Sequence, residues 1–135
     1  MTGLAASFQR DQVGSLAELL GLEWINAEPG RVEGRCVVRP HHLAPNGYLH
    51  AASVIALADT ACGYGCRTTL PEQAKGFTTA ELKANFLGTT RDGTISSTAT
   101  VVHAGQTTQV WDASVRNEVT GKIIGLFRCT QIILY

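Results

Sequence analysis

The sequence lacks an excess of charge of either sign. Eleven Lys and Arg residues balance eleven Asp and Glu residues among 135 residues, and no short cluster of basic residues occurs. Such a chain creates no field that attracts nucleic acid or an anionic membrane surface. It also lacks an apolar run long enough to cross a bilayer, and its N-terminus lacks the basic start and apolar core of a secretory signal. We therefore expect a cytoplasmic protein with neither nucleic-acid nor membrane partners.

The sequence has four cysteines, and their positions form no metal-binding pattern. Cys62 and Cys66 are four residues apart, on one face of a helix, but no C-x-x-C or H-x-x-x-H spacing provides further zinc ligands. A disulfide is not expected in a cytosolic chain. We expect these two residues, together with Cys36 and Cys129, to be small apolar side chains of the core. The sequence thus indicates no metal and no bound cofactor.

The first half of the chain has the pattern of two strands between a short helix and a long one. Ser15 and Glu18 have the spacing of a capping box. The turn at residues 28–30 separates two extended segments, and Pro71 stops the long helix. These elements are expected as a short helix at 15–20, strands at 22–27 and 31–39, a loop at 40–48 and the main helix from His50 to about Thr69.

The second half changes to a pattern typical of strands, with Thr, Val and Ile in alternation. The expected strands are residues 76–87, 94–103, 106–117 and 122–134. The breaks between them are short and contain glycine, and short connections require antiparallel neighbours. We therefore expect an α+β fold in which the long helix lies on a curved antiparallel sheet, with the last four strands in a consecutive meander. The whole chain, residues 1–135, is expected to be a single domain.

Asp59 is the only charged residue between His50 and Arg67, inside an apolar stretch of the expected helix. A lone carboxylate in such a position is costly unless it is hydrogen-bonded or has a task. It could serve as a general base or a nucleophile in acyl transfer. The alternative is a structural carboxylate that is bonded to the backbone or to Thr60.

Polar groups also gather where this helix begins, because Asn46-Gly47 forms a turn just before His50. A helix N-terminus offers free backbone N–H groups and the positive end of its dipole. The N–H groups of Ala51 and Ala52 would therefore suit a carbonyl oxygen that gains negative charge. The alternative for His50 is that it only caps or packs the turn.

The spacing of these groups sets a geometric limit. Asp59 lies nine residues beyond His50, which on a helix corresponds to roughly 13.5 Å of rise and about half a turn in direction. One copy of the chain therefore does not bring both residues to the same carbonyl. If both serve one site, a second subunit must supply one of them.

At these residues the chain resembles the hotdog-fold acyl-CoA thioesterases of the PaaI-like (phenylacetate-degradation) type. The family pattern is Asn-Gly, two variable residues, His, a small pair, and a carboxylate nine positions after the His, often within Leu-Ala-Asp-Thr-Ala. Residues 46–52 and 57–61 follow it here, and residues 78–87 look like the family's next strand. The layout of a helix followed by four strands extends the likeness over most of the chain.

The resemblance implies that the chain hydrolyses an acyl-CoA thioester. It implies that Asp59 is the catalytic carboxylate, that the Ala51 N–H polarises the thioester carbonyl and that His50 shapes that pocket. It further implies that Thr79 helps to hold the attacking water. The family's sites lie at the interface of a homodimer, which is often paired again into a homotetramer.

Two departures from the family pattern bear on catalysis. Two glycines usually follow the histidine, and this chain has Ala51-Ala52, which narrows the approach to the backbone. Many members carry Asn or Gln six positions before the histidine, where this chain has Ala44. Either Asn46 takes over part of that role or the oxyanion is held less fully, and loss of one such donor typically costs about a hundredfold in rate.

Three functions remain open after this comparison. The first is hydrolysis of a small or aromatic acyl-CoA, and the second is a catalytically weak hotdog protein that binds acyl-CoA as a sensor or carrier. The third, a hydratase, ranks low because its pattern places a histidine five residues after the Asp, where this chain has Tyr64. Aromatic residues that could line an aromatic-sized pocket, or equally pack in the core, are Tyr48, Tyr64, Phe77 and Trp111. Candidates by charge for contact with CoA are Lys83, Arg91, Arg116, Lys122 and Arg128.

Overall fold

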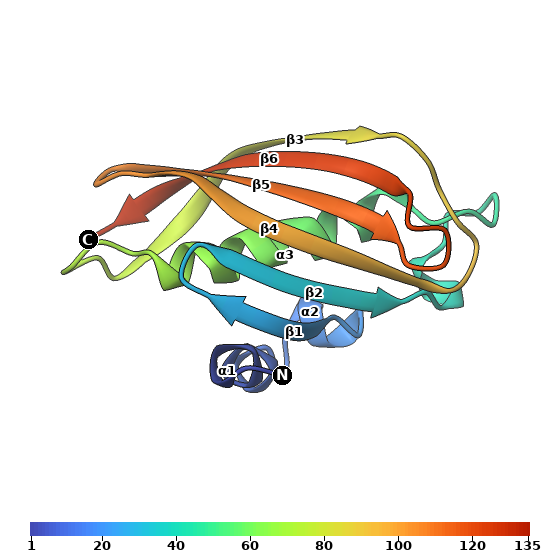
Figure 1. Ribbon diagram of the computed structural model, residues 1–135, viewed down its shortest axis with the longest axis horizontal. Coiled ribbons are helices and arrows are strands. Elements are labelled where there is room, and N and C mark those ends of the chain that lie inside the picture. Colours follow the sequence, from blue (N-terminus) through green and yellow to red (C-terminus); the bar gives the residue numbers. More distant parts are fainter.

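A six-stranded antiparallel sheet curves around one long helix (Figure 1). The computed structural model describes residues 1–135. Its elements are α1 (Gly3–Asp11), α2 (Leu16–Leu19), β1 (Glu23–Glu28), β2 (Arg31–Val37), the 3₁₀ helix η1 (Pro40–His42), α3 (Ala51–Thr68), β3 (Gly76–Phe86), β4 (Thr94–Ala104), β5 (Thr108–Asn117) and β6 (Ile123–Leu134). The expected α+β hotdog arrangement is confirmed. None of the helices is long and apolar enough to cross a membrane.

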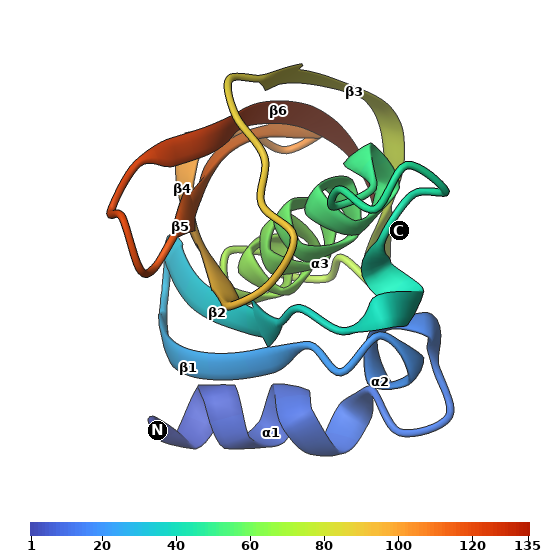
Figure 2. The ribbon, with the colours of Figure 1, turned by 90° about the vertical axis from the view of Figure 1, so that its right-hand side faces the viewer.

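The order of the strands differs from the expected meander at one place. The sheet runs β1-β2-β4-β5-β6-β3, so that β4 pairs with β2, and β3 pairs with β6 at the far edge. The prediction that β3 and β4 are hairpin neighbours was therefore wrong. Residues 87–93 instead pass across the end of α3 to reach β4 on the other side of the sheet (Figure 2). Alternation identifies a strand but does not identify its partner.

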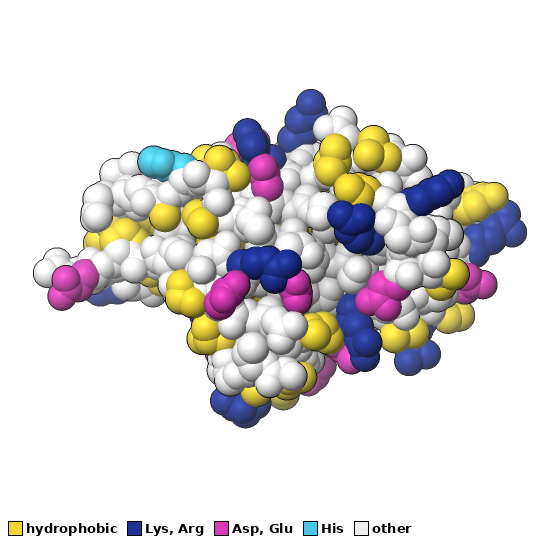
Figure 3. All heavy atoms as spheres, in the orientation of Figure 1, with side chains coloured by type: hydrophobic (Ala, Val, Ile, Leu, Met, Phe, Trp, Pro, Cys, Tyr) yellow, Lys and Arg dark blue, Asp and Glu magenta, His cyan; other side chains and the backbone are white.

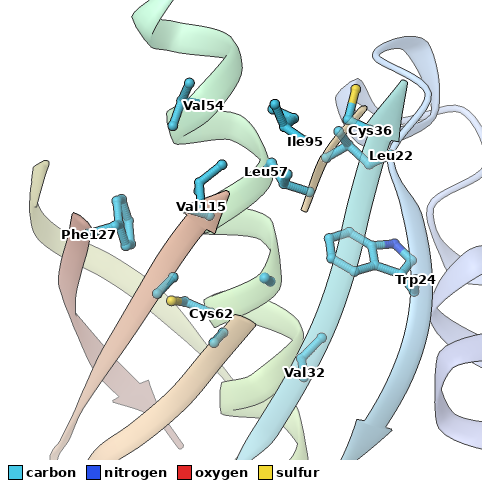
Figure 4. Packing of buried hydrophobic residues seen from close by; sticks show 14 of the residues in the cluster. Leu22, Trp24, Val32, Cys36, Val54, Leu57, Cys62, Ile95, Val115 and Phe127 are labelled. Atoms are coloured by element: carbon cyan, nitrogen blue, oxygen red, sulfur yellow. The ribbon is translucent and has the colours of Figure 1, made fainter. Parts of the chain in front are cut away.

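The core lies between α3 and the inner face of the sheet. Val54, Leu57 and Cys62 of α3 point toward side chains of the strands, among them Ile95 and Val115 (Figure 4). Full burial of an aliphatic side chain of this size contributes about 1.5–3 kcal/mol. The helix therefore holds its position mainly through one apolar face.

One glycine allows α3 to approach the sheet closely. A Cβ atom on Gly65 would lie 2.4 Å from the Trp111 ring, a distance that real Cβ atoms do not reach. Trp111 is fully buried, and its Nε1–H donates to the Gln109 side chain over 2.8 Å. The structure thus places Trp111 in the core rather than in a pocket wall.

The four cysteines are all buried with free thiols, as expected of core residues. Burial raises the pKa of Cys36 to about 11 and that of Cys66 to about 12. Both therefore remain neutral thiols at physiological pH, and they pack as small apolar groups.

Helix α1 was not predicted, and it covers the edge of β1. Side chains at its C-terminal end replace the missing strand neighbour where β1 begins: the Gln9 Oε1 accepts from the Trp24 N–H over 2.9 Å, and Gln12, just after α1, donates to the Leu22 carbonyl over 2.8 Å. The edge of β1 is therefore not available for pairing with another chain.

The short helix α2 forms where it was expected, but its capping box does not. Ser15 donates its hydroxyl to the Gln12 carbonyl instead of accepting from the helix. The Glu18 carboxylate accepts from the Gly14 N–H over 3.1 Å. The backbone that follows α1 thus binds both side chains, so the spacing of Ser15 and Glu18 did not predict their hydrogen bonds.

Candidate active site

The turn before α3 is held by its own backbone and by Asn46. Gly47 has a φ of +85°, which glycine adopts readily. The Ala44 N–H donates to the Tyr48 carbonyl over 2.7 Å, and the Asn46 Oδ1 accepts from the Tyr48 N–H over 3.1 Å. The amide nitrogen of Asn46 has no hydrogen-bond partner within the chain, so it remains available to an external acceptor.

His50 caps the start of α3. Its Nδ1 accepts from the Ala52 N–H over 2.9 Å, and its backbone is extended, with φ −68° and ψ 136°. The capping role considered for His50 is thus present in the structure. Because Ala52 donates to this cap, Ala51 is left as the exposed helix-terminal N–H with no acceptor in the chain.

These residues surround an open pocket of about 460 Å³, which we call the helix-start pocket. The Arg91 guanidinium lies over the Tyr48 ring, 4.2 Å from its centroid, at the edge of this pocket. The residues that line the pocket are Ala44, Asn46, Tyr48, Leu49, His50, Ala51 and Thr89. The pocket therefore offers N–H donors and contains no carboxylate.

Asp59 opens into a different pocket, of about 240 Å³, which we call the Asp59 pocket. Its Oδ1 is buried and has no hydrogen-bond partner, so the structure does not show the alternative in which Thr60 or the backbone binds this carboxylate. Burial raises the pKa of Asp59 above the ordinary value of 3.8. The residues that line the pocket are Asp59, Thr60, Gly63, Tyr64, Arg67, Phe77 and Thr79.

Thr79 reaches the Asp59 pocket from strand β3 on the edge of the sheet. Its hydroxyl donates to the Gln131 Oε1 over 2.7 Å, and Gln131 is fully buried. The hydroxyl proton is therefore directed away from the pocket, and the oxygen is left as a hydrogen-bond acceptor. Sequence reasoning missed Gln131, although alternation along β6 places it on the inner face, where an amide needs a partner.

The structure thus brings Asp59 together with Thr79, and Asn46 and His50 together with Ala51, but it keeps these two groups in separate pockets. One pocket offers a base, and the other offers a donor for a negatively charged oxygen. No group of three or more His, Cys, Asp and Glu side chains could hold a metal ion.

Comparison with known proteins identifies the family to which the chain belongs. Residues 46–124 match the thioesterase superfamily. The chain is 31% identical over 115 residues to a 1,4-dihydroxy-2-naphthoyl-CoA hydrolase of Listeria monocytogenes, which covers 85% of this chain and 92% of that protein. It is also 31% identical over 113 residues to the acyl-coenzyme A thioesterase PaaI of Escherichia coli, which covers 83% of this chain and 77% of that protein.

Solved structures agree with the fold over nearly the whole chain. The E. coli PaaI protein superposes with a TM-score of 0.84 at 25% identity, covering 98% of this chain and 94% of that chain. A thioesterase variant from Staphylococcus aureus superposes with a TM-score of 0.84 at 31% identity, covering 89% of this chain and 98% of that chain.

Proposed function

Because the chain belongs to the thioesterase superfamily and is a thioester hydrolase, we propose that its substrate is a small or aromatic acyl-CoA, which it hydrolyses to the free acid and CoA. The observation that carries this proposal is the half-buried Asp59 carboxylate, whose buried Oδ1 has no hydrogen-bond partner and which lines a pocket beside Thr79. A structural carboxylate would be expected to have its hydrogen bonds satisfied.

We propose that Asp59 and Thr79 hold the attacking water from two sides. Since the Thr79 hydroxyl donates to Gln131, the water can donate one proton to Thr79 and the other to Asp59. Its lone pair is then directed at the thioester carbon. Asp59 takes the proton as the C–O bond forms, and collapse of the tetrahedral intermediate breaks the C–S bond and releases the CoA thiolate, which then takes a proton. Direct attack by the Asp59 carboxylate is the alternative route.

In this proposal, the Ala51 N–H of a second subunit donates a hydrogen bond to the carbonyl oxygen and stabilises its negative charge. Asn46 supports the same oxygen with its free amide nitrogen, while His50 fixes the helix start. In the S. aureus thioesterase, a glutamine and a glutamate at positions 32 and 47 of that chain were each replaced by alanine. Ala44 and Asp59 have the same separation of 15 residues, so we place Ala44 where that protein has its glutamine.

A homodimer is supported by the edge of the sheet. Strand β3 pairs only with β6, and most of its 11 residues are exposed, among them Thr79 and the apolar Leu82 and Phe86. Pairing of two β3 edges would continue the sheet and satisfy the free backbone groups. It would also enclose the Asp59 pocket with a second copy of the chain.

A homotetramer is our proposal for the full assembly. Leu126, Ile132 and Leu134 of β6 are exposed apolar side chains on the outer face of the sheet, where Arg128 and Thr130 lie between Leu126 and Ile132, so a second dimer could cover this face. On the face seen in Figure 3, apolar side chains gather in small groups between charges of both signs. We further propose that residues 1–135 form one hotdog domain that acts in the cytoplasm, where the free thiols would stay reduced.

The proposed acyl group follows from the walls of the Asp59 pocket. Tyr64 and Phe77 line it, whereas Trp111 is in the core and Tyr48 lines the helix-start pocket. A pocket with two aromatic walls suits a flat or short acyl group better than a long chain. The relative that hydrolyses a naphthoyl-CoA supports an aromatic substrate.

A thiol-release assay over a panel of acyl-CoA thioesters of different length and aromaticity tests this function. We expect turnover of at least one short or aromatic member, with long-chain members hydrolysed more slowly. If every thioester gives only the background rate while the protein still binds them, the chain is the acyl-CoA sensor or carrier that the absence of an amide at Ala44 would allow.

Replacing Thr79 by alanine is expected to lower kcat by about tenfold, because one hydrogen bond to the water, about 1–1.5 kcal/mol, is lost and a second water can partly replace it. Thr78→Ala is the matched control. Thr78 directly precedes Thr79 in β3 and does not line the pocket, so this variant should keep its activity. Steady-state kinetics of both variants check the prediction. A loss for Thr79→Ala as large as that for removal of the Asp59 carboxylate would contradict the assigned roles.

A further inference from the structure

His42 is a buried histidine of η1 whose ring is hydrogen-bonded on both sides. The residue is only 2% exposed. Its Nδ1 accepts from the Arg39 N–H over 2.9 Å, and its Nε2 lies 2.7 Å from the Leu20 carbonyl oxygen. Because a carbonyl oxygen only accepts, Nε2 carries the proton and the ring is neutral. Burial lowers the pKa of His42 below the ordinary value of 6.5, so this form persists at neutral pH.

The backbone carbonyl of the same residue holds the start of α3. It accepts from the His50 N–H over 2.9 Å and from the Ser53 hydroxyl over 2.8 Å. His50 is the N-cap of α3, and Ser53 lies in the first turn of the helix. The peptide group that follows His50 is planar and includes the Ala51 N–H. The direction of this N–H therefore depends on how His42 holds the residues around it.

We propose that His42 is a positioning residue: its ring fixes η1, and its carbonyl then fixes the direction of the Ala51 N–H. The proposal rests on the proposed function, in which this N–H stabilises the negative carbonyl oxygen. Such a donor must point to the place where the charge develops, and a misplacement of about 1 Å can cost about 100-fold in rate. His42 does not line the helix-start pocket, so it would act without touching the substrate.

The bond from the ring to Leu20 is the one that no other contact replaces. The turn of η1 is also closed by its backbone, since the His42 N–H donates to the Arg39 carbonyl over 2.9 Å and the Leu43 N–H donates to the Pro40 carbonyl over 3.1 Å. In contrast, the bond from Nε2 to the Leu20 carbonyl is the only hydrogen bond between η1 and α2 with its C-cap Leu20. The carbonyl groups at the end of a helix need such an external donor. The ring thus ties the start of α3 to the end of α2.

Two substitutions of His42 separate its two ring contacts. In His42→Gln the amide nitrogen can take the place of Nε2 and keep the bond to Leu20. In His42→Asn the amide oxygen can take the place of Nδ1 and keep the bond from Arg39, but the tie to Leu20 is lost. We expect His42→Asn to lower kcat by about 10- to 100-fold and His42→Gln to retain most of the activity. The KM for the thioester should change little in both, because the Asp59 pocket is unaltered.

The competing explanation is that His42 only stabilises the fold, and Gln12→Met is the matched control for it. Gln12 is 3% exposed, and its side chain likewise accepts one hydrogen bond, from the Trp24 Nε1–H over 2.7 Å, and donates one, to the Leu22 carbonyl over 2.8 Å. It lines neither pocket. Gln12→Met should therefore lower the melting temperature about as much as His42→Asn and keep the wild-type kcat.

Steady-state kinetics at a temperature well below every melting point compare these proteins. If His42→Asn is less stable than the wild type but has the same kcat, the proposal is overturned. An equal fall in kcat for Gln12→Met would overturn it as well, because general loss of stability would then explain both variants.

Ser53→Ala tests whether the effect passes through the His42 carbonyl. This substitution removes one of the two bonds to the carbonyl and leaves the ring in place. We expect a smaller fall in kcat than for His42→Asn. In the double variant the combined fall should be less than the product of the two single effects, because a displaced carbonyl no longer holds the Ser53 hydroxyl. Independent effects would contradict this route.

Hydrogen exchange measured by NMR separates this inference from the proposed function. The Ala52 N–H donates to the His50 Nδ1, and the Ser53 N–H donates to the His50 carbonyl, so both amides report the order of the helix start without a substrate. Exchange should be faster at both in His42→Asn than in the wild type and in Gln12→Met. If this is found but no thioester is hydrolysed, the positioning stands and the proposed function fails. If exchange is unchanged in His42→Asn, His42 is not a positioning residue, whatever the protein hydrolyses.

Discussion

Replacing Asp59 by asparagine is expected to lower kcat by about 10²–10⁴-fold, the usual contribution of a positioned general base. The amide has almost the same shape as the carboxylate but takes no proton from water and does not attack a thioester. The substrate should still bind, because the walls of the Asp59 pocket are unchanged. Steady-state kinetics on the best substrate of the thioester panel measure the effect, and Asp112→Asn is the control, since that carboxylate pairs with Arg128 at the surface.

The same variant should be as stable as the wild type at neutral pH, or slightly more stable. Burial raises the pKa of Asp59, so the folded chain binds this proton more tightly than the unfolded chain does. Stability therefore falls as the pH rises from the unfolded pKa to the folded one, and above the folded pKa the ionised Asp59 lowers the free energy of unfolding. Asparagine carries no charge and avoids this loss.

Activity of the wild type should show the opposite trend with pH. It should fall as the pH drops through a pKa above 3.8, because protonated Asp59 is no longer a base, and this acid limb should be absent from the residual activity of the variant. A variant with a clearly lower melting temperature, whose folded fraction keeps full activity, would show that Asp59 is structural.

Much of the fold was predictable from local pattern, because the elements are strongly periodic. The long helix was expected from His50 to about Thr69 and is found at Ala51–Thr68. The partner of β3 was not predictable, since its pairing with β6 joins segments that lie far apart in the sequence. Helix α1 was missed for a related reason: only two of its apolar side chains, Ala5 and Phe8, are buried, and its contact with the start of β1 relies on hydrogen bonds of Gln9 and Gln12.

The candidate site, like the fold, could be predicted from the sequence only in part. The spacing of His50 and Asp59 within one helix predicts that one chain does not bring both to the same carbonyl, and the structure places them in two pockets. The orientation of the Thr79 hydroxyl depends on Gln131, and the orientation of Arg67 depends on Asp11. Both contacts need the tertiary fold, so the sequence pointed to the groups that we propose to react but not to the residues that orient them.

Two inactive variants should restore each other's activity if the active site is shared between subunits. Ala51→Pro removes the N–H donor of the helix-start pocket, and loss of such a donor typically costs about 10²–10³-fold in kcat. Proline is tolerated at the first position of a helix. The Ala51 N–H makes no hydrogen bond in the chain, and His50 already has the extended backbone that the residue before proline requires. The substitution should therefore remove catalysis without unfolding α3.

In a dimer of Asp59→Asn with Ala51→Pro, one site would inherit both defects and the other neither. In an equal mixture about half of the dimers are mixed, and each has one intact site of two, so about a quarter of the wild-type activity should return after joint refolding. Either variant refolded alone should stay inactive. Subunit exchange is verified by mass spectrometry of chains that carry different tags.

The double variant Asp59→Asn, Ala51→Pro provides the converse test with the wild-type chain. If each site takes Asp59 from one subunit and Ala51 from the other, both sites of such a mixed dimer contain one defect. An excess of the double variant should then suppress the wild-type activity. If each chain instead held a complete site, the wild-type chains would keep their full activity in every dimer, and the two single variants would not rescue each other. The shared site requires both rescue by the single variants and suppression by the double variant. A folding defect in Ala51→Pro would prevent rescue, and it would also leave the wild-type activity unsuppressed. If subunit exchange is verified and no activity returns, the shared site is ruled out.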